Sequence, residues 1–245
     1  MRIQFVGCGD AFGSGGRFNT CFHLTGERTN VLIDCGASSM VALKRLAIDR
    51  NALDTILVTH FHGDHFGGIP FFILDAQFVS KRTQPLTIAG PPGLPGWYAR
   101  VMETTFPGSS STEQKFDLSL REIEVGKTTE VGSLRVTSFH VRHDDRAGPC
   151  LAYRIVVEGR VIAFSGDTEW TDALIEVGRE ADLFSCEAYM REHAIRAHMS
   201  LKKLERHLPE IRPKRLVLTH LSEDMLGHRG EVSYQIAEDG LVIDL

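Results

Sequence analysis

This sequence lacks disulfide frameworks and long apolar runs. Its five cysteines are an odd, scattered set, and none forms a Cys-x-x-Cys pair, which is typical of reduced thiols in a cytoplasmic protein. No apolar run reaches the roughly 18 residues that a membrane-spanning helix needs. The first strand-like run, within MRIQFVGCGD, is broken by glycine too early for a signal peptide. We therefore expect a cytoplasmic protein with no membrane partner.

An excess of basic residues is also missing. The chain has 27 Lys and Arg against 32 Asp and Glu, a formal net charge of −5, which disfavours non-specific binding to nucleic acid or anionic lipid. Its 245 residues are 42% hydrophobic and 24% charged, so the chain can bury a core without disulfides. Since no linker or low-complexity segment divides it, we expect residues 1–245 to form a single domain.

Short apolar runs bounded by Gly, Asp or Asn predict strands. The expected strands are residues 3–6, 31–33, 55–58, 86–89, 134–139, 151–157, 161–164, 183–185, 216–218 and 241–243. Helical periodicity appears at residues 38–46, 66–79, 97–104, 171–177 and 201–207. Strands cluster in the middle of the chain, and strand–helix alternation flanks them. This order predicts one α/β domain of mixed sheets with helices packed outside.

The densest chemical signal is the segment THFHGDH at residues 59–65. Three of the 11 histidines of the chain lie between positions 60 and 65, and the apolar pattern of a strand does not explain that density. The segment follows an expected strand and contains a glycine, so it forms a tight loop. His60 and His62 can share one metal ion while Asp64 and His65 face a second, because imidazole and carboxylate suit zinc, iron or manganese.

A site with two metal ions needs further ligands, and strand ends elsewhere in the chain offer them. Asp167 ends an apolar strand and can bridge two ions. His220 ends a strand in Thr-His, as His60 does, and two such strand ends suggest a site at one sheet edge. His140 and His143 both follow another strand. Taken alone, Asp167 is also explained as a helix N-cap, and His220 as a buried, hydrogen-bonded histidine.

The order of these motifs over residues 59 to 220 resembles the metallo-β-lactamase superfamily: THFHGDH, a strand-end histidine, SGDT and LTH. GGIP after the first motif, the later PLTIAGPPG and the N-terminal FVGCG are similar to the ribonuclease Z-like phosphodiesterase branch. The resemblance implies a four-layer αβ/βα sandwich, in which two mixed β-sheets are flanked by helices. It also implies a dinuclear metal site at the sheet edges, and dimers.

The resemblance further implies which residues bind the metals. The expected ligands are His60, His62 and His143 for the first ion, Asp64, His65 and His220 for the second, and Asp167 as the bridge between them. His143 is preferred to His140 because it lies nearer the next strand, which contains an aromatic residue. The expected cofactors are two divalent ions, zinc in the first place and manganese or iron as alternatives.

The chemistry of such a centre is the activation of water for hydrolysis. Asp64 can accept a proton in addition to binding metal. His198, in the segment AHMS, resembles the short His-Ser/Thr motif that the ribonuclease Z-like branch places over its site. This implies a general acid for the leaving alkoxide, oriented by Glu187 or Glu169, whereas the alternative is an exposed loop histidine. The glycine-rich loop at residues 13–19 either receives an anionic substrate or is a plain turn.

The expected function is metal-dependent hydrolysis of a small or single-stranded phosphodiester. Ribonuclease Z carries a tRNA-grasping arm between the strand-end histidine and the bridging aspartate. Here positions 143 and 167 are only 24 residues apart, without a Lys/Gly-rich insertion, which argues against tRNA as the substrate.

The sequence leaves open two other functions and a homodimer. A lactone or thioester hydrolase on the same metal site is the first alternative, with Phe71, Phe72, Trp97 and Tyr98 as lining for an acyl pocket. A non-catalytic metal-binding module is the second, and it is disfavoured because every expected ligand position is filled. The apolar face of residues 66–79 is the candidate surface for a homodimer.

Overall fold

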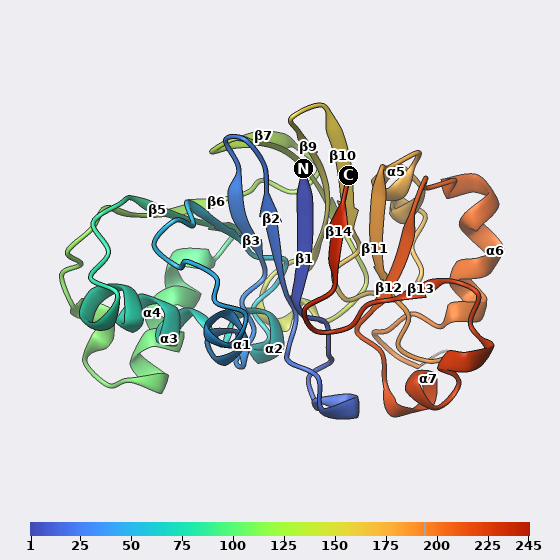
Figure 1. Cartoon of the computed structure of the whole chain (residues 1–245), viewed down its shortest axis with the longest axis horizontal. Helices are drawn as coiled ribbons and strands as arrows, with labels where there is room; N and C mark the ends of the chain where they lie inside the picture. The colour runs from blue at the N-terminus through green and yellow to red at the C-terminus, as the bar shows by residue number, and fades with distance from the viewer. Residues whose placement is uncertain (194) are drawn as a thin grey trace.

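The computed structural model describes residues 1–193 and 195–245, and their strands form two sheets of seven strands each (Figure 1). The first sheet has the strand order β14-β1-β2-β3-β4-β5-β6, and the second has the order β13-β12-β11-β10-β9-β8-β7. The strands of the first sheet are β1 (Arg2–Gly7), β2 (Cys21–Thr25), β3 (Asn30–Ile33), β4 (Thr55–Leu57), β5 (Leu86–Gly90), β6 (Leu118–Glu122) and β14 (Val242–Asp244). The strands of the second are β7 (Thr128–Val131), β8 (Leu134–His140), β9 (Leu151–Val157), β10 (Arg160–Phe164), β11 (Leu183–Glu187), β12 (Leu216–Thr219) and β13 (Gln235–Ile236).

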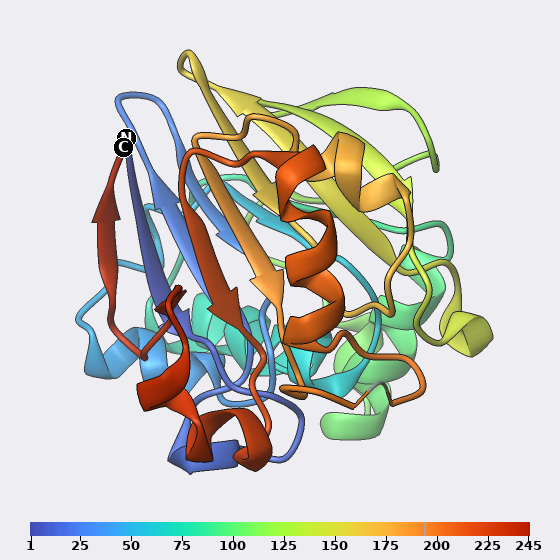
Figure 2. The ribbon, with the colours of Figure 1, turned by 90° about the vertical axis from the view of Figure 1, so that its right-hand side faces the viewer.

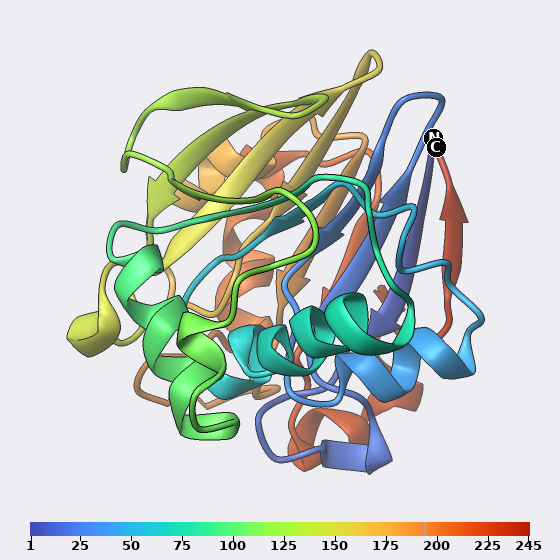
Figure 3. The same cartoon turned by 90° about the vertical axis from the view of Figure 1, so that its left-hand side faces the viewer.

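Helices cover the outer faces of both sheets. The α-helices are α1 (Ser39–Arg45), α2 (Gly63–Phe66), α3 (Ile69–Leu74), α4 (Leu94–Thr105), α5 (Ala173–Gly178), α6 (Leu201–Ile211) and α7 (Glu223–Gly227). Shorter helical turns are η1 (Ser14–Gly16), η2 (Asp75–Val79), η3 (Ser109–Ser111), η4 (Asp145–Ala147) and η5 (Arg229–Glu231). Figure 2 shows α5 and α6 against the second sheet, and Figure 3 shows α1, α3 and α4 on the side of the first. This is the expected four-layer αβ/βα sandwich, and none of its described helices is long and apolar enough to cross a membrane.

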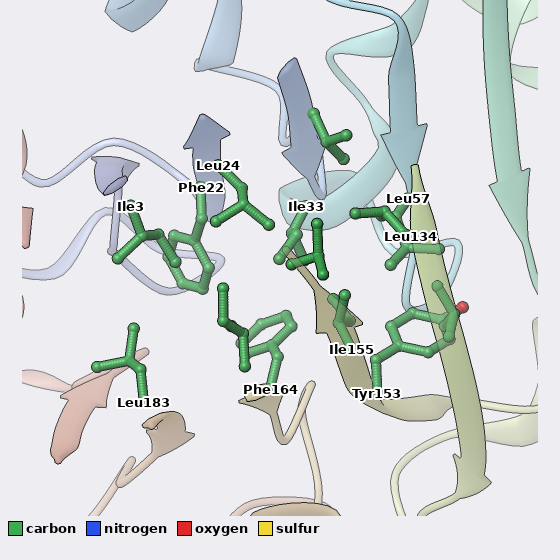
Figure 4. Packing of buried hydrophobic residues seen from close by; sticks show 14 of the residues in the cluster. Ile3, Phe22, Leu24, Ile33, Leu57, Leu134, Tyr153, Ile155, Phe164 and Leu183 are labelled. Carbon is green, nitrogen blue, oxygen red and sulfur yellow. The ribbon is translucent and has the colours of Figure 1, made fainter. Parts of the chain in front are cut away.

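The main core lies between the two sheets (Figure 4). Phe22 from β2 packs edge-on against Phe164 from β10, with ring centroids 5.0 Å apart, so the contact joins the two sheets. Alternation along β9 explains the layering: Tyr153 and Ile155 face this inner core, while Ala152, the residue before Tyr153, faces the helices outside. A period of two is what a strand with apolar layers on both faces requires.

Strand direction brings several loops to one edge of the sandwich. β3, β4 and β5 are parallel, and β10, β11 and β12 are parallel. β8 runs in the same direction as β10, because both pair antiparallel with β9. In Figure 2 the arrowheads of β11 and β12 point to the lower edge, where α6 begins. The segments that follow β4, β8, β10 and β12 therefore meet, which is the placement of ligands in open α/β sheets.

Every strand expected from the sequence is present to within a residue or two. Three strands of four or five residues, β2, β6 and β7, were missed. β6 and β7 each lie at one edge of a sheet, and exposed edges carry a weak apolar pattern. β2 contains His23, which interrupts its apolar run. The expected helix 66–79 is divided among the end of α2, α3 and the π-helical turn η2. Helix α6 continues to Ile211, past Pro209.

Candidate metal centre

The seven residues expected to bind metal lie on four segments at the shared edge. His60 and His62 follow β4, and Asp64 and His65 belong to the first turn of α2. The other three are His143 after β8, Asp167 after β10 and His220 after β12. His220 has a φ of 56°, a left-handed conformation that is costly outside glycine and is often found at functional sites. The fold thus brings together residues up to 160 positions apart in the chain.

The side-chain donors form two groups. One consists of His60, His62 and His143, and the other of Asp64, His65, Asp167 and His220; within each group the candidate ligand atoms lie within 4.8 Å of one another. Each group therefore has the dimensions of a site for one metal ion.

The Asp167 carboxylate lies between these two groups. Its Oδ1 is 3.2 Å from His65 Nε2, and its Oδ2 is 3.1 Å from His220 Nε2. On the other side, Oδ2 is 4.0 Å from His60 Nε2 and 3.9 Å from His143 Nε2. A carboxylate in this position has one side toward each group, which is the arrangement of a bridging ligand.

Orphaned nitrogen atoms show that the donor set suits cations. His60 Nε2 and His65 Nε2 are fully buried and have no hydrogen-bond partner among the described residues. A buried polar atom without a partner costs about 1–3 kcal/mol. Divalent cations accept lone pairs from imidazole and carboxylate groups, so ions held by these side chains would remove that cost. The residues present therefore fit the metals that the fold implies.

Electrostatics keeps three of the ligands in their binding forms. Burial, with a further contribution from His65, lowers the pKa of His60 well below its usual value, so this imidazole is neutral. Burial acts to raise the pKa of Asp167, but the adjacent His220 and His65 outweigh it and hold this pKa well below its usual range. The same balance, with His65 as the main partner, lowers the pKa of Asp64. Both carboxylates are therefore ionised at neutral pH.

Comparison with known proteins agrees with this geometry. A family model described as anti-Pycsar protein Apyc1 matches residues 1–240. The chain belongs to the Apyc1 family.

Wider relatives place this Apyc1-family chain in the metallo-β-lactamase superfamily, in its ribonuclease Z-like branch. It is 26% identical to ribonuclease Z of Geobacillus kaustophilus, over 98% of this chain and 93% of the relative. The crystal structure of human tRNase Z, short form, has a TM-score of 0.79 at 26% identity, covering 100% of this chain and 99% of that one. The metallo-β-lactamase fold protein YhfI of Bacillus subtilis has a TM-score of 0.80 at 20% identity, covering 99% and 98%.

A carboxylate that the sequence argument missed orients His65. Asp34 follows β3, is fully buried, and has its Oδ2 2.7 Å from His65 Nδ1. Thr59 donates to the same carboxylate from its backbone N–H and its hydroxyl. With Nδ1–H directed at Asp34, the Nε2 of His65 points into the site. The signal was available, because Asp34 ends an apolar strand as Asp167 does.

The structure brings His143, and not His140, to the candidate centre. The Nδ1–H of His143 donates to the Ala197 carbonyl at 2.8 Å, so its Nε2 faces Asp167. His140, the last residue of β8, is exposed and has its Nε2 3.1 Å from the exposed carboxylate of Asp145.

His198 lies over the same site and pairs with Glu187. Its Nδ1 is 2.9 Å from Oε2 of Glu187, a fully buried residue at the end of β11. Burial acts to lower the pKa of His198, but Glu187 outweighs it and raises this pKa above its usual value. The ring stacks on Tyr189 at 4.5 Å and lies edge-on to His143 at 4.9 Å. Glu169, the other carboxylate considered, instead accepts the backbone N–H of Ala197.

The glycine-rich loop at residues 13–19 is occupied by contacts within the protein. The backbone N–H and hydroxyl of Ser14 donate to Asp10. The N–H of Gly15 donates to Glu223, and the N–H of Phe18 donates to Asp239. Since carboxylates of the chain itself already accept these N–H groups, the contacts favour the interpretation as a turn over that as an anion-binding loop.

Proposed function

We propose that this protein is a metal-dependent phosphodiesterase that hydrolyses small or single-stranded phosphodiesters. The observation that carries the proposal is the pair of donor groups sharing Asp167, with the His198–Glu187 pair directly beside them. The relatives called ribonucleases support a phosphodiester as the bond that is cleaved.

Two divalent cations are the proposed cofactors, with zinc as the first choice and manganese or iron as alternatives. His60, His62 and His143 would hold one, Asp64, His65 and His220 the other, and Asp167 both. When bound, such ions make a water molecule a stronger nucleophile and offset negative charge on the phosphoryl oxygens. The related structure of PqqB from Methylobacterium extorquens is described as Zn(2+)-bound, which supports zinc.

Two side chains of the protein would move protons in this reaction. His198, protonated because of Glu187, is the proposed general acid that donates a proton to the leaving alkoxide. Asp64 is ionised and is the proposed acceptor for a proton from the nucleophile. Its lowered pKa keeps the carboxylate ionised, as a proton acceptor must be before the reaction.

The shape of the chain supports small or short substrates over tRNA. The interval between His143 and Asp167 contains only the turn η4 and the hairpin of β9 and β10, which leaves no room there for a long arm. The alignment with the Geobacillus ribonuclease Z extends over 294 positions, more than the 245 residues of this chain. The relative thus has segments that this chain lacks.

The proposal extends to the organisation of the protein. We propose one domain over residues 1–245, because the site draws residues from both halves of the sequence. The five cysteines are all free and buried, which supports a reducing compartment such as the cytoplasm.

Phe71, Phe78 and Val79 are exposed along α3 and η2, and they support a homodimer through this face. Light scattering of the purified protein would show whether its mass corresponds to two chains or to one.

A substrate comparison tests the proposed function. Purified protein supplied with zinc, manganese or iron is expected to hydrolyse bis(p-nitrophenyl) phosphate, with a higher kcat/KM than for a lactone or a thioester. Asp167→Asn should abolish turnover, while Asp182→Asn, which changes a carboxylate far from the site, should not. Faster turnover of the lactone or thioester would favour the alternative acyl hydrolase, and no turnover with any metal would contradict the proposal.

The structure gives the acyl hydrolase less support. Phe72 is buried in the core between the first sheet and its helices, so it does not line an open acyl pocket. The cavity that adjoins His198 is lined instead by several cationic side chains.

A further inference from the structure

A cavity of about 430 Å³ opens beside His198, a volume within the range of small-molecule sites. Its walls come from the first turns of α6, from the segment before α6, and from Arg142 and Trp170. We call it the α6 cavity. Figure 2 shows α6 rising from the edge where β11 and β12 end, which is the edge that carries the candidate metal centre.

Cationic side chains dominate the lining of the α6 cavity. Its basic residues are Arg142, Lys202, Lys203 and Arg206, and its acidic residues are Glu169 and Glu192. Lys202 pairs with Glu192 at 2.7 Å. Within the described part of the chain, the side chains of Arg142, Lys203 and Arg206 have no ion pair. These charges gather around one hollow in a chain whose formal net charge is −5, so they create a local positive potential that attracts anions.

The backbone of α6 would contribute little to binding an anion there. The N–H groups of Leu201 and Lys202 donate to the carbonyls of Met190 and Arg191, and the N–H of Lys203 donates to Ser200. An anion in the cavity would therefore be held by the cationic side chains. Trp170, Ile195 and Met199 provide the apolar part of the wall, which suits a sugar or ring that joins the anion to the rest of a ligand.

His198 connects this cavity to the reacting centre. It lines the cavity, and its ring also lies within 4.8 Å of ligand atoms of His143 and Asp167. A substrate whose phosphodiester lies at the candidate metal centre would reach the cavity past the proposed general acid. The part that enters the cavity is then the leaving group, because the general acid protonates the leaving oxygen.

We infer that the α6 cavity binds a second phosphate, carried by the leaving alcohol of the phosphodiester. This inference rests on the proposed function and narrows its substrate class. The preferred substrates are phosphodiesters whose leaving alcohol bears a terminal phosphate, such as a phosphorylated short oligonucleotide. Lys203 and Arg206 are the residues that distinguish this substrate from one without the second phosphate.

Three deoxydinucleotides test the inference: TpT, pTpT and TpTp, which differ only in a terminal phosphate at one end or the other. With the wild-type protein, one of the two phosphorylated forms should have a KM about tenfold lower than TpT, since only that form makes charged hydrogen bonds to Lys203 and Arg206. In the double variant Lys203→Gln/Arg206→Gln this preference should be lost. Lys127→Gln, which removes an exposed charge just before β7, should retain it.

Two results would overturn the inference: neither phosphorylated form is preferred by the wild type, or the double variant keeps the preference. If TpT is hydrolysed in the first case, only the inference fails and the proposed function stands. If no dinucleotide is hydrolysed with zinc, manganese or iron, turnover of bis(p-nitrophenyl) phosphate decides the proposed function by itself. Calorimetry then decides the inference alone, because the α6 cavity predicts tighter binding of pTpT or TpTp than of TpT, and weaker discrimination in the double variant.

Discussion

Asp34 and His65 are joined by a contact of 2.7 Å between the carboxylate Oδ2 and the imidazole Nδ1, deep beneath the candidate metal centre. Both side chains are fully buried. Because the Nδ1–H is directed at Asp34, the Nε2 of His65 is presented toward Asp64 and Asp167. Partners of this kind typically change metal affinity by 10–100-fold when they are removed.

Asp34→Asn should therefore weaken metal binding by about 10–100-fold while leaving the fold intact. Asn is the least disruptive replacement, because it keeps an acceptor for the Thr59 N–H and tolerates the left-handed φ of 59°. Competition with a chromogenic chelator measures the affinity, and circular dichroism checks the fold. Asp182→Asn, far from the site, is the matched control. An unchanged affinity in Asp34→Asn would contradict the proposed orientation of His65.

His143→Ala and His140→Ala form a matched pair that tests the third ligand of the first ion. We expect His143→Ala to lose bound metal and activity, because its Nε2 faces Asp167. His140→Ala should retain both, because this side chain only meets an exposed Asp145. Metal content per chain, measured by mass spectrometry of the dialysed protein, separates the two variants. The reverse result would assign the ligand to His140.

His198→Ala should reduce kcat by about 10²–10⁴-fold for a substrate with an alkyl leaving group, the usual contribution of a general acid. The loss should be much smaller for a p-nitrophenyl phosphodiester, since p-nitrophenolate leaves without a proton. Steady-state kinetics on the two substrates measures this difference. His228→Ala is the control, because His228 hydrogen-bonds Asp224 on α7. Equal losses on both substrates would show that His198 acts other than by protonating the leaving group.

The ion pairs of Asp75 predict a pH dependence of stability that does not involve the candidate metal centre. Its carboxylate is buried, accepts a hydrogen bond from Arg50 at 2.9 Å and forms an ion pair with Lys44 at 3.0 Å. Burial acts to raise the pKa of Asp75, but these two cations outweigh it and lower the pKa in the folded state. A carboxylate with a lowered folded pKa stabilises the fold above its unfolded pKa of about 4, and this stabilisation is lost as the pH falls through the folded pKa.

Asp75→Asn should accordingly lower the free energy of unfolding by about 1–3 kcal/mol at pH 7, and by progressively less as the pH is lowered below 4. Urea denaturation of both proteins at several pH values measures this. Asp244→Asn, which breaks an ion pair with Arg2 between two well-exposed side chains, should change stability by less than about 1 kcal/mol at any pH. A constant difference between Asp75→Asn and wild type across the pH range would contradict the assigned ion pairs.

The sequence by itself was sufficient for the parts of this protein whose signals are local. THFHGDH concentrates ligands within a few residues, and the strand-end aspartate and histidine at positions 167 and 220 follow recognisable apolar runs. The alternation of strands and helices predicted the layers, since apolar period and chain punctuation act over short stretches. The strands β6 and β7 were not predicted from the sequence. Each has a neighbouring strand on one side only, so neither requires a strong apolar pattern.

Only the tertiary structure decided which side chains meet across long stretches of chain. His140 ends β8 and His143 follows it. The carbonyl of Ala197, 54 residues from His143, holds this second histidine toward Asp167. Asp34 contacts His65 because the strands that precede them, β3 and β4, are parallel neighbours in the sheet. From the sequence alone, the cations of the α6 cavity cannot be told from an ordinary solvated helix face. Their common hollow exists because α6 begins where β10 and β11 end, and such proximity depends on packing between elements, which no local pattern encodes.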